Sequence, residues 1–255
     1  MKFACVHRLD ELSKNLADKL SSQLMANGYK CDMSNPEVVF VIGGDGTFLY
    51  AVHKYLDKLD DISFLGIHTG TLGFFTDYTD AEYDEFINDF LNKEPDIIEY
   101  QLLKVETSNE VYYALNEMRV ENVKRTQKIK VYVNDEEFEE FAGTGLCICT
   151  QLGSTAFNRS LKGAVIQEGL PLIQMSEISG IHNRYYQSLG TSIVMKEDAQ
   201  ISFVSDSFES ALLCIDFNTY SLDHEQEVKI KLSGKKVRML RYKKVGYFKR
   251  LKSLF

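Results

Sequence analysis

The strongest constraint on the fold is a short apolar run, VVFVI at residues 38–42, that leads directly into Gly-Gly-Asp-Gly at residues 43–46. A run that is rich in β-branched residues and free of polar ones is typical of a parallel strand buried on both faces. The glycine turn is followed by a helix-like segment, residues 47–56. A strand, a turn and a helix in this order predict a right-handed α/β unit with a parallel sheet.

The same alternation extends over the first third of the chain. Leucines at three- and four-residue steps predict an amphipathic helix that ends at Asn27-Gly28. A second apolar strand, residues 63–67, enters another glycine loop, and Thr79 with Glu82 has the spacing of a capping box. We therefore expect a doubly wound α/β domain over residues 1–95. The leucines of the stripe are Leu9, Leu12, Leu16, Leu20 and Leu24.

From residue 96 onward, short strand-like segments follow one another with polar turns between them. This pattern predicts an antiparallel, β-rich C-terminal domain over residues 96–255. Helical breaks are expected only after the GSTAFN segment (residues 153–158) and near residues 174–186.

The net charge of −8 hides an asymmetry, because 11 of the 29 Lys and Arg residues follow the last acidic residue, Glu227. Residues 1–227 keep 18 bases against 37 acids, a net charge of −19. A basic tail is compatible with nucleic acid or anionic lipid, but the acidic body repels polyanions. We expect the tail to form a strand that either folds back on the body, where it can return to the first domain, or meets an acidic neighbouring subunit. We expect no nucleic-acid or membrane partner.

The chain lacks an apolar run of about 18 residues, the length of a membrane-spanning helix. Its start turns polar too early for a signal peptide, and five cysteines are an odd number. These features predict free thiols and a cytoplasmic location. All five cysteines, Cys147 and Cys149 included, are expected in the core, with no protein-derived metal site.

Four segments carry candidate chemistry, each with an ordinary structural alternative. The first, residues 43–47, places glycines and Asp45 at a helix start, which suits either a phosphoryl-transfer base or a helix cap. The second, residues 66–74, offers Phe74 for stacking on a base or for the core, and His68, which we expect at the surface. The third is Ala-Leu-Asn-Glu at residues 114–117, and the fourth is residues 153–160. These two suit a purine and a ribose, or else a turn and a helix start capped by Ser154.

In this order and at these separations, the four segments resemble the NAD kinases, especially the short forms of Gram-positive bacteria. IGGDGT alone is shared with lipid kinases and 6-phosphofructokinases of the same superfamily. The resemblance implies transfer of the γ-phosphate of ATP, or of polyphosphate in some members, to the 2′-hydroxyl of the adenosine ribose of NAD. It also implies Mg²⁺ bound with ATP near Asp45, and a homodimer or homotetramer. The alternatives are a non-catalytic NADP-sensing module and another small-molecule or lipid kinase of the superfamily.

The resemblance assigns Asp45 as the catalytic base and also as an NAD-site residue. The family's usual Arg-Gly-Asp-Gly-Leu is here Ala142-Gly-Thr144-Gly-Leu, so both charged residues of that motif are replaced. The remaining positions that match NAD- or ATP-binding residues are Gly46, Phe74, Asn116, Glu117, Thr144, Leu152, Thr155, Ala156, Phe157, Asn158, Arg159, Ser160, Ser179 and Asp216.

Overall fold

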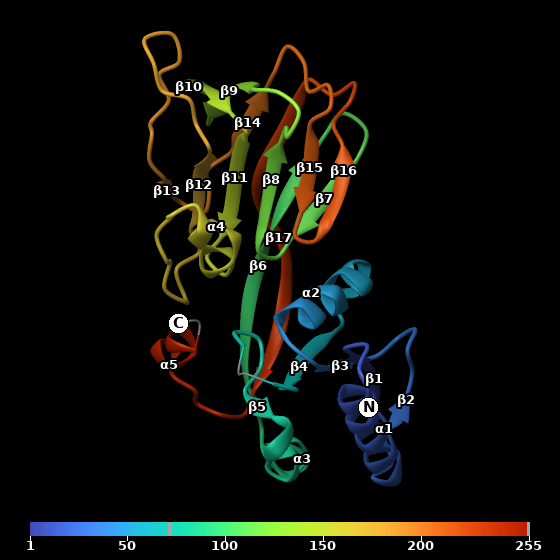
Figure 1. Ribbon diagram of the computed structural model, residues 1–255. Coiled ribbons are helices and arrows are strands. Elements are labelled where there is room, and N and C mark those ends of the chain that lie inside the picture. Colours follow the sequence, from blue (N-terminus) through green and yellow to red (C-terminus); the bar gives the residue numbers. More distant parts are fainter. Residues whose placement is uncertain (71–72, 254–255) are drawn as a thin grey trace. The chain divides into compact units, whose positions relative to one another are not determined.

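The computed structural model describes residues 1–70 and 73–253. The chain forms two compact units, Met1–Tyr100 with Lys235–Phe255, and Gln101–Gly234 (Figure 1). Two long strands, β6 (Asp96–Glu106) and β17 (Glu227–Arg241), have residues in both units. From Lys235 onward the basic C-terminal segment belongs to the first unit, whereas Lys229 and Lys231 belong to the second.

The first unit is built on a parallel sheet with the strand order β2-β1-β3-β4, and both β17 and β5 pair with β4. The fully buried strand β3 lies between β1 and β4, as the apolar run predicts. The elements of this unit are β1 (Lys2–His7), α1 (Glu11–Ala26), β2 (Lys30–Cys31), β3 (Val38–Ile42), α2 (Asp45–Lys54), η1 (Leu56–Lys58), β4 (Ser63–His68), β5 (Tyr78–Thr79), η2 (Asp80–Glu82), α3 (Tyr83–Asn92) and α5 (Tyr247–Lys252).

Helices cover both faces of this sheet, which makes it doubly wound as predicted. Leu20 of α1 and Phe86 of α3 share one core cluster with Phe40 of β3. On the opposite face, Phe48 of α2 packs on Phe64 of β4 at a ring separation of 5.6 Å. Because side chains alternate along a strand, β3 and β4 contribute residues to both cores.

The second unit is a sandwich of two β-sheets. One sheet is antiparallel in the order β13-β12-β11-β8-β15-β16, and the other contains β10, β9, β14, β17, β6 and β7. Its elements besides β6 and β17 are β7 (Val111–Ala114), β8 (Glu117–Glu121), β9 (Gln127–Val133), β10 (Glu136–Gly143), β11 (Gly145–Thr150), η3 (Gly153–Thr155), α4 (Phe157–Ser160), β12 (Ile173–Ile178), β13 (Ile193–Met195), β14 (Ile201–Val204), β15 (Leu212–Ile215) and β16 (Asn218–Ser221).

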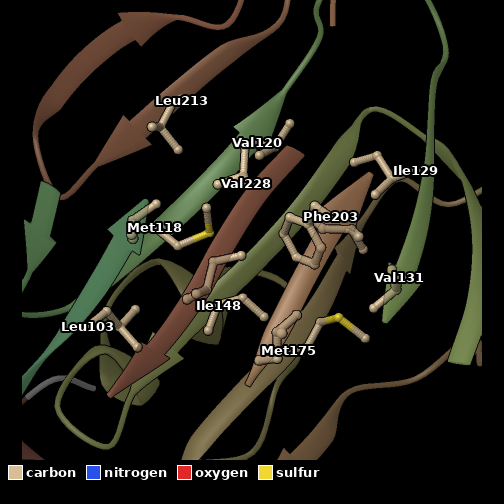
Figure 2. Packing of buried hydrophobic residues seen from close by; sticks show 14 of the residues in the cluster. Leu103, Met118, Val120, Ile129, Val131, Ile148, Met175, Phe203, Leu213 and Val228 are labelled. Carbon is tan, nitrogen blue, oxygen red and sulfur yellow. The ribbon is translucent and has the colours of Figure 1, made fainter. Parts of the chain in front are cut away.

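Figure 2 shows the core between the two sheets of this unit. Met118 and Ile148 come from the first sheet, and Phe203 and Val228 come from the second. All four side chains are fully buried. The prediction of an antiparallel, β-rich second domain is confirmed by this arrangement.

Several local expectations are corrected by the structure. Residues 173–178 form strand β12 rather than part of a helical break, because they pair with β11 on one side and β13 on the other. Helix α1 begins after Asp10, whose carboxylate caps it, so Leu9 lies outside the helix and is 97% exposed. The capping box of Thr79 and Glu82 is confirmed.

The cysteines are all free thiols. Cys147, Cys149 and Cys214 are buried as expected, but Cys31 is exposed because β2 is an edge strand. Cys5 is only half-buried. None of the helices described has the length and hydropathy of a membrane-spanning segment.

Candidate active site

The predicted site residues fall into two groups, one in each unit. The first unit holds Asp45, Gly46 and Phe74, and the second holds the remaining twelve. Each group is built by loops that follow strand ends, so the side chains are positioned by the sheets. Among the described residues, no group of three His, Cys, Asp or Glu side chains is arranged to hold a metal ion.

Asp45 is the first residue of α2, and its carboxylate is held by the second glycine loop. Its Oδ2 accepts a hydrogen bond from the Phe74 amide at 3.1 Å, and its Oδ1 accepts one from the Phe75 amide at 3.2 Å. The carboxylate therefore does not cap its own helix, which was the structural alternative for this motif. Gly73 makes the contact possible, since a Cβ there would lie 2.3 Å from Asp45 Oδ1.

Asp45 remains half-buried and Gly46 is exposed, so the helix start is open to a ligand. The amides of Thr47 and Phe48 donate to the Gly44 carbonyl, and those of Asp45 and Gly46, at the very start of α2, favour an anion such as phosphate. Phe74 is half-buried, and the centre of its ring lies 6.1 Å from that of Tyr247 of α5 in an edge-to-face arrangement. Thr71 and Leu72 of the second glycine loop lie outside the described residues.

His68 lies at the end of β4 and is only 8% exposed. The expectation that it lies at the surface is therefore wrong. Its ring lies against the first glycine loop, where a Cβ on Gly44 would be 3.3 Å from His68 Nε2. Burial lowers the pKa of His68, while the negative charge of Asp45 opposes that shift. His68 is consequently a neutral part of the loop packing at pH 7.

In the second unit, Asn116 and Glu117 present two buried acceptors without partners. They are 8% and 7% exposed, and within the described part of the chain Asn116 Oδ1 and Glu117 Oε2 accept no hydrogen bond. An unsatisfied acceptor in a buried position lowers stability unless a ligand supplies a donor. An adenine amino group and a ribose hydroxyl are donors of this kind.

Asp216 holds the backbone of this segment. Its carboxylate accepts hydrogen bonds from the amides of Leu115 at 2.8 Å, Asn116 at 2.8 Å and Glu117 at 3.2 Å. The residue is 7% exposed and adopts a left-handed backbone with φ of 50° at the turn between β15 and β16. These contacts give Asp216 the role of a support beneath Asn116 and Glu117.

Glu117 has an unusual charge environment. Burial raises its pKa to about 7, and the negative charge of Asp216 acts in the same direction. The positive charge of Arg119 and a hydrogen bond from the Phe157 amide oppose the shift. Glu117 is thus poised to change its charge near neutral pH.

Residues 152–160 form a compact turn, η3 followed by α4, next to Asn116. Gly153 packs directly on the chain, since a Cβ there would lie 2.0 Å from the Asn116 carbonyl oxygen. Asn158 is fully buried, and its Oδ1 accepts a hydrogen bond from Ser176 at 2.7 Å. Ser154 does not cap a helix, because its hydroxyl donates to the Gln151 carbonyl.

The other members of this turn differ in exposure. Leu152 is buried, Thr155, Ala156 and Phe157 are half-buried, and Arg159 and Ser160 are exposed. The half-buried residues and the exposed ones are the members of the turn that a ligand can reach.

Thr144 and Ser179 line a separate cavity of about 230 Å³. Lys124 and Arg125 line the same cavity, so cations are present where the family's usual aspartate is missing. Ala142, at the position of the usual arginine, is fully buried on β10. Its burial leaves no space for a long charged side chain without rearrangement of the core.

Sequence analysis missed Arg119. An arginine two residues after Glu117 in a strand carries no local signal. What distinguishes Arg119 is the contact of its guanidinium with the ring of Phe157, which lies 38 residues further along the chain.

Two family models match the chain. The model of the ATP-NAD kinase N-terminal domain matches residues 6–95, and that of the ATP-NAD kinase C-terminal domain matches residues 108–242. The NAD kinase of Latilactobacillus sakei is 36% identical over 95% of this chain and 93% of its own length. The NAD kinase of Leuconostoc mesenteroides is 35% identical over 100% of this chain and 98% of its own length.

Two solved structures share the fold. The NAD kinase from Archaeoglobus fulgidus in complex with ATP superposes with a TM-score of 0.81 at 20% identity, covering 99% of both chains. The yeast NADH kinase complexed with NADH also gives a TM-score of 0.81, at 14% identity, covering 100% of this chain and 86% of its own. At these identities the likeness concerns the fold alone.

Proposed function

The chain belongs to the NAD kinase family, and we propose that it transfers the γ-phosphate of ATP to the 2′-hydroxyl of the adenosine ribose of NAD, which yields NADP and ADP. The observation that carries the assignment of roles is the pair of buried acceptors without partners on Asn116 and Glu117. Their chemistry fits an adenosine, whose amino and hydroxyl groups donate hydrogen bonds.

Asp45 is the proposed general base. Its carboxylate takes the proton of the 2′-hydroxyl, whose oxygen attacks the γ-phosphorus while the bond from that phosphorus to the bridging oxygen of ADP breaks. Two backbone amides fix the carboxylate, so little reorganisation is needed at the moment of proton transfer. The amides at the start of α2 face the phosphates.

A magnesium ion fits this chemistry as a companion of ATP rather than as a resident of the protein. Magnesium keeps several of its waters and binds substrate phosphates, so the ion would lie with ATP near Asp45 and leave that carboxylate free to act as the base. When bound, the ion would neutralise part of the negative charge of the phosphates. We further propose that the protein is cytoplasmic. We also propose that it forms a homodimer or homotetramer, and sedimentation of the purified protein tests this number of subunits.

Incubation of the purified protein with NAD, ATP and Mg²⁺ tests the proposed reaction. NADP is measured with a dehydrogenase that accepts only NADP, and omission of ATP is the control. Binding of NADP without its formation would support the sensing module instead. Phosphorylation of a lipid or other small molecule, with NAD left unchanged, would support another kinase of the superfamily.

A further inference from the structure

Arg119 lies next to the proposed adenosine-binding residues, although the sequence analysis did not include it in the candidate site. It occupies β8 between Glu117 and Glu121, and residues two apart in a strand share one face of the sheet. Its guanidinium carbon is 3.9 Å from the centre of the Phe157 ring. Its Nη1 lies 2.8 Å from Glu121 Oε1, and its side chain is 18% exposed.

Phe157 connects this guanidinium to Glu117. The Phe157 backbone amide donates a hydrogen bond to the Glu117 carboxylate, while the Phe157 ring stacks on Arg119. The Phe157 ring has no hydroxyl that could fix it by a hydrogen bond, and the cation supplies an attraction to the face of the ring.

The charged groups around Glu117 act in opposite directions. Asp216 faces it from the turn after β15 and disfavours its ionised form, whereas Arg119 favours that form. On β11, Cys149 lies opposite Glu117 in the strand register, and burial raises the pKa of its thiol so that it stays neutral. Burial likewise raises the pKa of Cys147 and of Cys214, which flank Arg119 on β11 and β15. Arg119 therefore supplies the positive charge that offsets Asp216.

We propose that Arg119 is a positioning residue for the adenosine end of NAD, which holds the Phe157 ring in place and favours the ionised form of the Glu117 carboxylate, the form that accepts hydrogen bonds from ribose hydroxyls. This inference rests on the proposed function for its ligand. Its electrostatic part concerns the free protein and is testable without any substrate.

The first test follows the ionisation of Glu117 directly. Carbon-13 NMR of glutamate-labelled protein gives the titration midpoint of the Glu117 carboxyl, whose signal is identified by its loss in Glu117→Gln. Arg119→Met keeps the length of the side chain without its charge, and it should raise the midpoint by about one pH unit. Arg125→Met, at an exposed arginine paired with Glu209, is the matched control and should leave the midpoint unchanged. An unchanged midpoint in Arg119→Met would overturn the inference.

The second test separates positioning from a purely structural role. Arg119→Lys keeps a cation but loses the planar stack, so its Glu117 midpoint should stay near that of the wild type. Its KM for NAD should rise about fivefold, with kcat within twofold of the wild type, as expected for loss of about 1 kcal/mol of cation–π attraction.

This second variant also covers the case in which Arg119→Met fails to fold. Unchanged KM for NAD in Arg119→Lys would overturn the positioning role. If the wild-type protein makes no NADP, the proposed function fails, and the NMR titration still decides whether Arg119 controls Glu117.

Discussion

Among single residues, the two carboxylates with proposed roles lie in different surroundings. Asp45 is half-buried and tied to two backbone amides, and it remains accessible to a substrate. Glu117 is almost fully buried, and its pKa is raised to about 7. A base has to meet its proton donor, whereas a binding carboxylate gains strength from a dry environment. The two environments match the two proposed roles.

Replacement of Asp45 by Asn tests the proposed base. The amide cannot accept the proton of the 2′-hydroxyl, so kcat should fall by about two to four orders of magnitude, while binding of NAD persists. Steady-state kinetics and NAD titration calorimetry measure the two effects. Asp60→Asn, at an exposed loop position of the same unit, is the matched control and should keep full activity. Near-wild-type turnover of Asp45→Asn would remove Asp45 from the mechanism.

The raised pKa of Glu117 predicts that the free energy of unfolding decreases as the pH rises. Its pKa rises from 4.5 to about 7 on folding, so the folded state binds the proton more tightly than the unfolded state. The resulting stabilisation is complete below pH 4.5 and is lost as the pH rises through 7. Relative to Glu117→Gln, the wild-type protein should lose about 2 to 4 kcal/mol of unfolding free energy between pH 4.5 and 8. Urea denaturation at several pH values measures this difference, and parallel pH profiles of the two proteins would contradict it.

At the scale of elements, the turn between β15 and β16 supports the segment between β7 and β8. Asp216 comes from the first turn and binds three consecutive amides of the second segment. This arrangement fixes the backbone that carries the side chains of Asn116 and Glu117. The position of the proposed binding residues therefore depends on a turn that lies about 100 residues away in the sequence.

Asp216→Ala should consequently lower the free energy of unfolding by about 3 kcal/mol, because three buried amides lose a charged acceptor. The KM for NAD should also rise, since Asn116 and Glu117 lose their support. Chemical denaturation and kinetics measure these effects. Asp223→Ala provides the comparison, since that exposed carboxylate accepts one backbone hydrogen bond from Ser210. It should lower the free energy of unfolding clearly less than Asp216→Ala does, and equal effects of the two changes would argue against a special role for Asp216.

At the scale of the whole molecule, the chain returns to its first unit through β17 and α5. Asp77 is 3% exposed and forms ion pairs with Arg241 at 2.6 Å and Arg250 at 2.8 Å. Arg241 also donates to the carbonyl of Phe74, next to the amides that hold Asp45. The last basic segment is thereby joined to the second glycine loop of the site.

Asp77→Asn tests this connection. Removal of the carboxylate leaves two buried guanidinium groups without their counter-charge, which should lower the free energy of unfolding by about 3 to 5 kcal/mol. Glu99→Gln breaks the exposed ion pair with Lys236 and should cost less than about 1 kcal/mol. Thermal and chemical denaturation compare the two variants, and a similar small effect in both would show that the cluster adds little to stability.

The elements whose signals are local could be predicted from the amino-acid sequence. The buried strand at residues 38–42, the glycine turn after it, the capping box at Thr79 and the series of antiparallel strands all depend on neighbouring residues, and all are present. The motif order was sufficient to indicate the family. The roles of the individual site residues stay predictions.

The contacts that hold the proposed site residues could not be predicted, because they depend on the folded chain. Three contacts join residues that are distant in the sequence. They are the hydrogen bonds of Asp45 with the second glycine loop, those of Asp216 with the amides near Asn116, and the cation–π contact of Arg119 with the ring of Phe157. The burial of His68 and the strand at residues 173–178 also result from neighbours on other elements. Burial and charge environment are properties of those neighbours, so no pattern along the chain contains them.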